Sequence, residues 1–195
     1  IDLILNENIE DHALLSQCYN DLGSIYTRLK HYSLAMNYYE KAILKKNNTP
    51  SITYTGLAEI QIFMKNYQFA LEYLQKALDS HPKDAHLLIG NTYIKIGTVY
   101  SAMLDKDKAS EMFDKAVESQ LKIVSPEHPD LGYTYNAIGL MYSEMNEEDK
   151  AFEYIEKAYQ LQLQSLPHSH PDIGTSLENF GNLYMKQGNY DQALS

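Results

Sequence analysis

A short pattern recurs five times along this chain of 195 residues, and such repetition constrains the fold more than any other feature. Four copies centre on a glycine that follows a tyrosine or leucine by four residues and precedes a tyrosine by three. The four glycines are Gly23, Gly97, Gly139 and Gly181, and the remaining copy has Ala58 in that place. Successive anchors are 35, 39, 42 and 42 residues apart, which predicts one supersecondary unit per repeat.

Each copy has the features of two helices that cross closely. An alanine follows every anchor by 12 residues, and a second follows the four complete copies by 19 residues: Ala35, Ala70, Ala109, Ala151 and Ala193, then Ala42, Ala77, Ala116 and Ala158. Apolar residues recur at spacings of three and four, as on one face of an α-helix. Turn-forming residues such as Gly188 and Asn189 separate the two segments. The pattern therefore predicts an all-α chain of antiparallel helix pairs.

The order of tyrosine, Leu-Gly, tyrosine and two alanines, with Pro82 closing the second copy, resembles the tetratricopeptide repeat from about Asp11 to Ser195. This resemblance implies a right-handed superhelical solenoid of about five repeats, at 12–49, 50–83, 84–127, 128–169 and 170–195. The last repeat is incomplete and residues 1–11 resemble the tail of a preceding repeat, so we expect one solenoid fragment truncated at both ends. The 42-residue spacing and the two His-Pro-Asp sequences, 128–130 and 170–172, resemble kinesin light chains.

Composition excludes several classes of function. Acidic residues outnumber basic ones by 26 to 16, and a formal charge of −10 argues against a sequence-independent grip on nucleic acid. No apolar run approaches the ~20 residues of a membrane span, so we expect no membrane partner. Cys18 is the single cysteine and cannot form an internal disulfide, which favours a reducing, cytoplasmic setting.

Candidate chemistry is sparse. His168 and His170 are the closest histidine pair, but no ligand set completes a zinc site around them. Four of the seven histidines recur at one phase of the repeat, which favours a structural role near helix starts. Cys18 has no neighbouring base, and no glycine-rich phosphate loop occurs. We therefore expect neither catalysis, nor a metal or cofactor, nor a small-molecule substrate.

The surface of the first helices is the remaining candidate site. The resemblance implies that these helices line a concave groove that holds a peptide or a partner's helix. Asparagine side chains both donate and accept hydrogen bonds, and could bind an extended main chain, although they could equally be ordinary solvent-facing residues. Tyr133 is the aromatic residue expected to touch a ligand. The predicted groove residues are Asn20, Asn91, Lys95, Tyr133, Asn136, Asn179 and Asn182.

Three classes of function are compatible with these features. The first is a non-enzymatic scaffold for a protein or peptide partner, in its most specific form a cargo or adaptor module like that of kinesin light chains. The second is a regulatory or targeting arm of a larger enzyme. The third is end-to-end self-association, as opposed to a monomer. The groove lacks the set of basic residues with which some tetratricopeptide co-chaperones clamp a carboxylate, since Lys95 alone is basic there.

Overall fold

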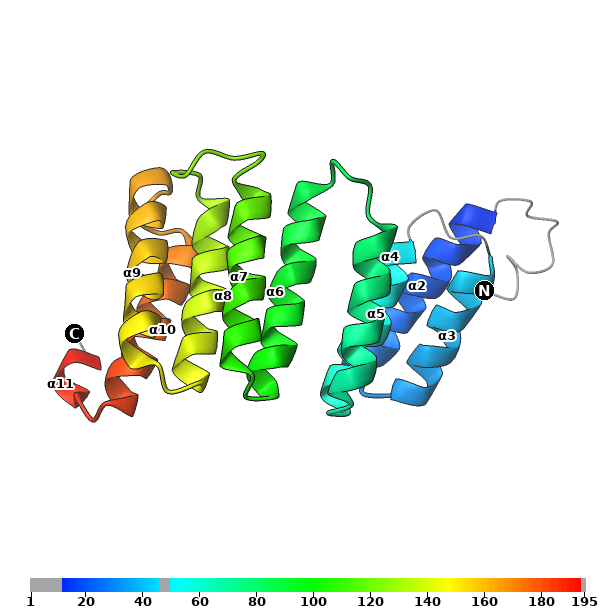
Figure 1. Ribbon diagram of the computed structural model, residues 1–195, viewed down its shortest axis with the longest axis horizontal. Helices are drawn as coiled ribbons and strands as arrows, with labels where there is room; N and C mark the ends of the chain where they lie inside the picture. The colour runs from blue at the N-terminus through cyan, green and yellow to red at the C-terminus, as the bar shows by residue number, and fades with distance from the viewer. Residues whose placement is uncertain (1–11, 46–49, 194–195) are drawn as a thin grey trace. The chain divides into compact units, whose positions relative to one another are not determined.

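The computed structural model describes residues 12–45 and 50–193, which form helices joined by turns and loops and contain no strand. The predicted tail at 1–11 lies outside the described residues. The all-helical prediction is confirmed (Figure 1). In chain order the helices are α2 (His12–Arg28), α3 (Tyr32–Leu44), α4 (Pro50–Phe63), α5 (Tyr67–Ser80), α6 (His86–Ala102), α7 (Lys106–Gln120), α8 (Asp130–Glu144), α9 (Glu148–Ser165), α10 (Pro171–Lys186) and α11 (Tyr190–Ala193).

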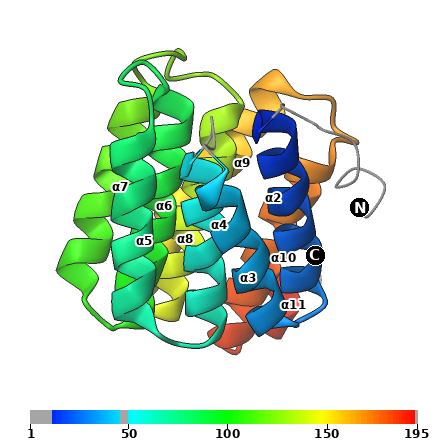
Figure 2. The same ribbon diagram turned by 90° about the vertical axis from the view of Figure 1, so that its right-hand side faces the viewer.

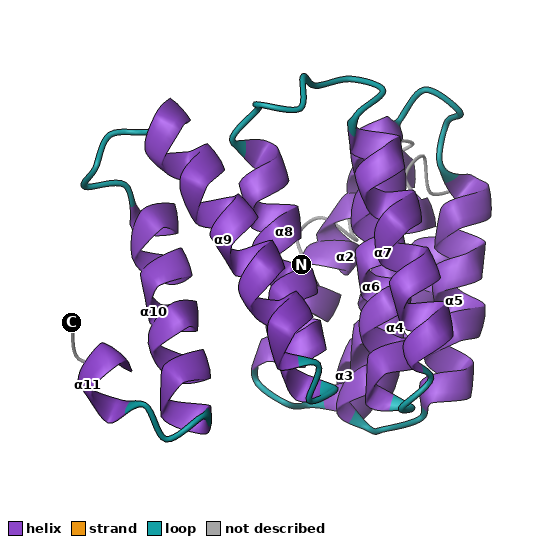
Figure 3. Ribbon diagram, turned by 60° about the vertical axis from the view of Figure 1, so that its left-hand side comes forward, coloured by secondary structure: helices purple, strands orange, loops and turns teal. Residues whose placement is uncertain are grey.

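The chain divides into two compact units, with the boundary after Pro82. Unit 1 holds the helix pairs α2/α3 and α4/α5, which Figure 2 shows as neighbouring rods. Unit 2 holds α6/α7 and α8/α9, followed by α10 and the short α11, as Figure 3 shows. Each predicted repeat range contains one such pair, because the turn signals in the sequence fall between its two helices.

A left-handed residue ends the first helix of every pair. At Lys30, for example, φ is 61°. The backbone N–H of Lys30 donates a hydrogen bond to the carbonyl oxygen of Thr27, and the N–H of His31 donates one of 2.9 Å to the carbonyl oxygen of Tyr26. This arrangement satisfies carbonyls that the helix end would otherwise leave without partners. The same conformation recurs at Lys65, Leu104, Asn146 and Gly188. It reverses the chain tightly enough for the second helix to pack against the first.

Small residues allow the two helices of a pair to pack closely. The alanines at the two recurring positions of α3, α5, α7 and α9 are fully buried, from Ala35 and Ala42 in α3 to Ala151 and Ala158 in α9, whereas Ala193 in α11 is only half-buried. A Cβ atom added to Gly97 on α6 would lie 2.5 Å from the ring of Phe113 on α7. At Gly23, Gly97 and Gly139 the glycine is therefore required by the approach of a large side chain from the second helix. At Gly181 an added Cβ would make only an ordinary contact, 3.5 Å from the carbonyl oxygen of Ala193.

Each unit has its own apolar core. In unit 1 the core is formed by Ala35, Tyr39, Leu57 and Ile60, with four tyrosines and Met36 packed around it. In unit 2 it includes Phe113, Ile138, Tyr142, Ile155 and Leu183. Burial of these side chains supplies most of the stabilisation, at about 1.5–3 kcal/mol for each large one.

The two His-Pro-Asp sequences begin first helices. The Nδ1 atom of His170 accepts a hydrogen bond of 3.3 Å from the backbone N–H of Asp172, and His128 makes the same 3.3 Å contact with Asp130. The proline that follows each histidine suits the first turn, where its missing N–H costs nothing. The acidic residue then favours the positive end of the helix dipole. These two histidines have the structural role that their repeated phase predicts.

Candidate functional site: the surface of the first helices

The first helices of unit 2 lie side by side. Helix α8 contacts α6 on one flank and α10 on the other, while α7 and α9 pack on them as second helices. Their uncovered side therefore forms one surface, which we call the first-helix face. On α8 the residues that point this way are spaced by four, three and four, namely Tyr133, Ala137, Leu140 and Glu144.

Three of the predicted groove residues lie in the interior instead. Asn136 on α8 is 5% exposed, and its Nδ2 donates a hydrogen bond of 2.7 Å to the hydroxyl oxygen of Ser176 on α10. That hydroxyl in turn donates to Oε1 of Gln162 on α9 at 2.6 Å. Asn179 on α10 is also buried, and its Nδ2 donates to Oδ1 of Asn136 at 3.2 Å. The four side chains form a buried polar network between consecutive repeats.

Unit 1 has the same link. Thr53 on α4 donates a hydrogen bond of 2.7 Å to Oδ1 of Asn20 on α2, and both side chains are buried. Asn20 occupies the repeat position of Asn136, and Thr53 that of Ser176. Neighbouring first helices approach closely enough here to exclude solvent, so a short amide and a hydroxyl satisfy one another. The expectation that Asn20, Asn136 and Asn179 face a peptide is therefore corrected: they join adjacent repeats.

The other predicted residues reach the surface to different degrees. Tyr133 is 68% exposed on α8, and Asn182 is exposed on α10. Asn91 and Lys95 are half-buried on α6. Leu140, which stands two turns from Tyr133 on the same stripe, is 38% exposed. The first-helix face thus presents a tyrosine and a leucine bordered by amide and lysine side chains.

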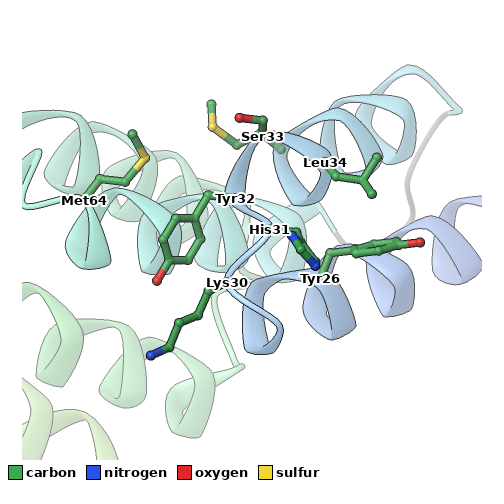
Figure 4. Close-up of a pocket in the computed structure, with 8 residues that line it drawn as sticks. Tyr26, Lys30, His31, Tyr32, Ser33, Leu34 and Met64 are labelled. Carbon is green, nitrogen blue, oxygen red and sulfur yellow. The ribbon is translucent and has the colours of Figure 1, made fainter.

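Unit 1 has two depressions that the prediction of groove residues missed. One, of about 580 Å³, is lined by eight residues around the α2–α3 turn, including Lys30, Tyr32, Leu34 and Met64. Figure 4 shows Lys30 and Tyr32 extending from the same side of this turn, with the rings of His31 and Tyr26 beside them. The second, of about 460 Å³, also contains Lys30 and Tyr32. The sequence feature that could have indicated these depressions is the presence of large apolar residues at turn positions, where polar residues usually occur.

Perturbed ionisable groups do not gather in these depressions. The pKa of Asp105 is lowered by its hydrogen bonds to Lys108, and that of Glu147 by its bond to Lys106. Burial raises the pKa of Tyr154 to about 12 and also raises that of Tyr39. The two carboxylates are in surface ion pairs and the two tyrosines pack in the fold, so these shifts have structural causes.

Two absences apply to the part of the chain that the structure describes. Across 12–45 and 50–193, no three His, Cys, Asp or Glu side chains come together in a way that could hold a metal ion. Among the same residues, no helix combines the length and apolar character that crossing a membrane requires.

The family follows from the helix pairs together with the sequence. The tetratricopeptide repeat family model matches residues 49–122, 107–164 and 130–195, and a second model of that family matches 16–44. The chain therefore belongs to the tetratricopeptide repeat family, whose members are generally non-catalytic scaffolds for protein–protein interaction. No curated protein matched the chain in sequence.

Several solved structures share the fold at low sequence identity. BtubC (BKLC) from P. vanneervenii superposes with a TM-score of 0.74 at 19% identity, over 98% of this chain and 80% of its own. The nearly identical TPR-like repeats of a kinesin light chain-type protein from Podosopora anserina superpose with a TM-score of 0.74 at 18% identity, over 96% of this chain and 92% of their own. The apo form of RapI superposes with a TM-score of 0.71 at 19% identity, over 99% of this chain and 54% of its own. At these identities the similarity establishes the fold.

Proposed function

We propose that this chain is a non-enzymatic interaction module that binds a peptide or helix of a protein partner on the first-helix face of unit 2. The observation that carries the proposal is the pair Tyr133 and Leu140, a large aromatic and an aliphatic side chain exposed on one stripe of α8. Exposed aromatic residues within a polar rim are typical of interface centres. Asn91, Lys95 and Asn182 supply that rim on the neighbouring helices.

The proposed partner is protein rather than nucleic acid, lipid or a small molecule. Unit 2 carries 17 acidic against nine basic residues (Lys83 to Ser195), which disfavours a phosphate backbone. The exposed aromatic residue of this face, Tyr133, is of a type that is enriched at protein–protein interfaces. A reducing, cytoplasmic setting is part of this proposal, because Cys18 is free and is the sole cysteine.

A more specific version of the proposal is recognition of a cargo or adaptor segment in the manner of a kinesin light chain. Two observations support it: the 42-residue spacing with its His-Pro-Asp helix starts, and the structural similarity to the Podosopora anserina repeats. A targeting arm of a larger enzyme and self-association are the competing hypotheses. The neighbouring domains of the full-length protein would distinguish the first two.

Site-specific crosslinking tests the location of the binding surface. A photoreactive phenylalanine analogue at position 133 should form covalent adducts with partner proteins in a native lysate. The same analogue at Tyr190, which is 64% exposed on α11, is the matched control and should give few adducts. Equal adduct patterns from both positions, or adducts of position 190 alone, would place the partner elsewhere. Adducts made only with the chain itself would favour self-association.

A further inference from the structure

The edge of unit 1 at which its first helices turn into its second helices has an unusual composition. We call residues 25–37 and 60–71 the turn edge; they cover the ends of α2 and α4 and the starts of α3 and α5. Six large apolar side chains are exposed there, and Phe63, at 61%, is the most exposed. They are Ile25, Leu29, Leu34, Phe63, Met64 and Phe69. Exposed apolar groups gathered on one edge mark an interaction surface more often than isolated ones do.

The charge of the turn edge is the reverse of that of the whole chain. It contains Arg28, Lys30 and Lys65 and no aspartate or glutamate, although the chain carries −10 overall. The corresponding segment of the fourth repeat, 141–152, has four acidic residues and one lysine. A local excess of positive charge on an acidic protein attracts a partner of opposite charge and steers its approach.

The turn edge is also hollowed. The depressions of about 580 Å³ and about 460 Å³ both include Lys30 and Tyr32, so these two side chains contribute to both. In the second depression the rings of Tyr32 and Phe63 stack with their centroids 6.0 Å apart, and Arg28 stands beside them. Glu59 also lines this depression, where two cations accompany it. Cavities of this volume hold large side chains of a ligand.

We propose that the turn edge binds a protein segment that presents acidic residues beside two large apolar side chains. The apolar side chains would enter the two depressions, and the carboxylates would face Arg28, Lys30 and Lys65. A lipid surface fits less well, because the edge has three cations, while lipid-binding clusters typically hold about four to eight, and because depressions suit protruding side chains. This binding surface lies in unit 1 and is separate from the first-helix face of unit 2.

A peptide array on the whole chain tests the proposal. The array holds peptides with two residues drawn from Phe, Leu and Met, spaced by three or four, in a glutamate background. The same peptides in glutamine and lysine backgrounds accompany them. The glutamate series should bind, and binding should weaken as salt is raised, because exposed charges are screened. The charge reversal Arg28→Glu, Lys30→Glu, Lys65→Glu should weaken it at least about tenfold, since the attraction becomes repulsion.

Two controls separate this inference from general charge effects and from the function proposed above. Lys41→Glu, Lys45→Glu, Lys76→Glu makes the same change in net charge on α3, its C-terminal end and α5, away from the turn edge, and should leave binding unchanged. Tyr133→Ala, Leu140→Ala alters the first-helix face and should also leave it unchanged.

Four outcomes would overturn the proposal. The first is that the glutamine peptides bind as tightly as the glutamate peptides. The second is that the Lys41, Lys45, Lys76 variant loses as much affinity for the glutamate peptides as the Arg28, Lys30, Lys65 variant does. The third is an array on which no glutamate peptide binds. The fourth is co-sedimentation with phosphatidylserine–phosphatidylcholine vesicles in place of peptide binding, which would show that the turn edge docks on a membrane.

Discussion

Asn136 on α8 and Ser176 on α10 join two consecutive repeats through a buried hydrogen bond of 2.7 Å. The same asparagine accepts a hydrogen bond from Asn179, and the same serine donates one to Gln162. Apolar packing alone would tolerate sliding of one repeat along the next. A buried polar network is satisfied in one register only, so we expect it to fix how these repeats stack.

Asn136→Ala should lower the free energy of unfolding by about 1–3 kcal/mol, because Nδ2 of Asn179 loses its acceptor in a buried place. Urea denaturation followed by circular dichroism measures this difference. Asn182→Ala is the matched control on the exposed surface and should change stability by less than about 0.5 kcal/mol. An Asn136→Ala variant of unchanged stability that fails to bind a partner would instead make Asn136 a ligand contact.

Gly97→Ala should destabilise the chain by about 1–3 kcal/mol, because the added methyl group would overlap the buried ring of Phe113. Gly174→Ala is a control of the same chemistry. Its Cβ would meet no atom within 4 Å, and it lies inside α10. There the substitution should stabilise by about 0.5–1 kcal/mol, because glycine loses more chain entropy in a helix. Equal effects in thermal denaturation at the two sites would show that α6 and α7 do not pack this closely.

Leu104→Gly should raise the stability by about 0.5–1 kcal/mol. Leu104 has φ of 63° and is 77% exposed, so it bears the cost of a left-handed backbone and contributes little to the core. Glycine adopts this conformation without steric conflict. Differential scanning calorimetry of both proteins checks the prediction. A lower melting temperature in the variant would mean that the leucine side chain stabilises the turn.

Tyr154→Phe should reduce the loss of stability at high pH. Burial raises the pKa of Tyr154 from 10.0 to about 12, and neighbouring Tyr142 contributes to the rise. The folded state therefore keeps a proton that the unfolded chain has released. This stabilisation is complete below pH 10 and is lost as the pH rises towards about 12. Urea titrations across this window should show a shallower decline for the variant, and parallel declines would contradict the assigned burial.

The repeat itself could be predicted from the sequence, because small residues recur where the two helices of a pair pack closely. Ala109 and Ala116 are fully buried, and Gly97 lies against Phe113, where a larger residue would not fit. The left-handed turn at Gly188 could be predicted from the sequence, because glycine favours that conformation. The same turn at Leu104 could not be predicted, because its conformation is imposed by the helix pair rather than by the residue type.

The candidate site was only partly predictable. Helical phase places Asn136 and Tyr133 on the side of α8 away from its partner helix, and it does not indicate how near the next first helix comes. That distance decides whether an asparagine binds a ligand or bonds to Ser176. Tyr133 extends beyond the contact and remains exposed. The turn edge was missed because Leu29 and Phe63 resemble ordinary packing residues until their neighbours are known.

The central claim is that partners bind the first-helix face of unit 2 through Tyr133 and Leu140. The most direct test is the dissociation constant of a crosslinked partner, measured by isothermal titration calorimetry for Tyr133→Ala, Leu140→Ala and for the control Tyr190→Ala. The double variant should bind at least about tenfold more weakly, since truncating a central aromatic costs about 2 kcal/mol or more. The control should match the unaltered chain. Equal dissociation constants for all three proteins would contradict the claim.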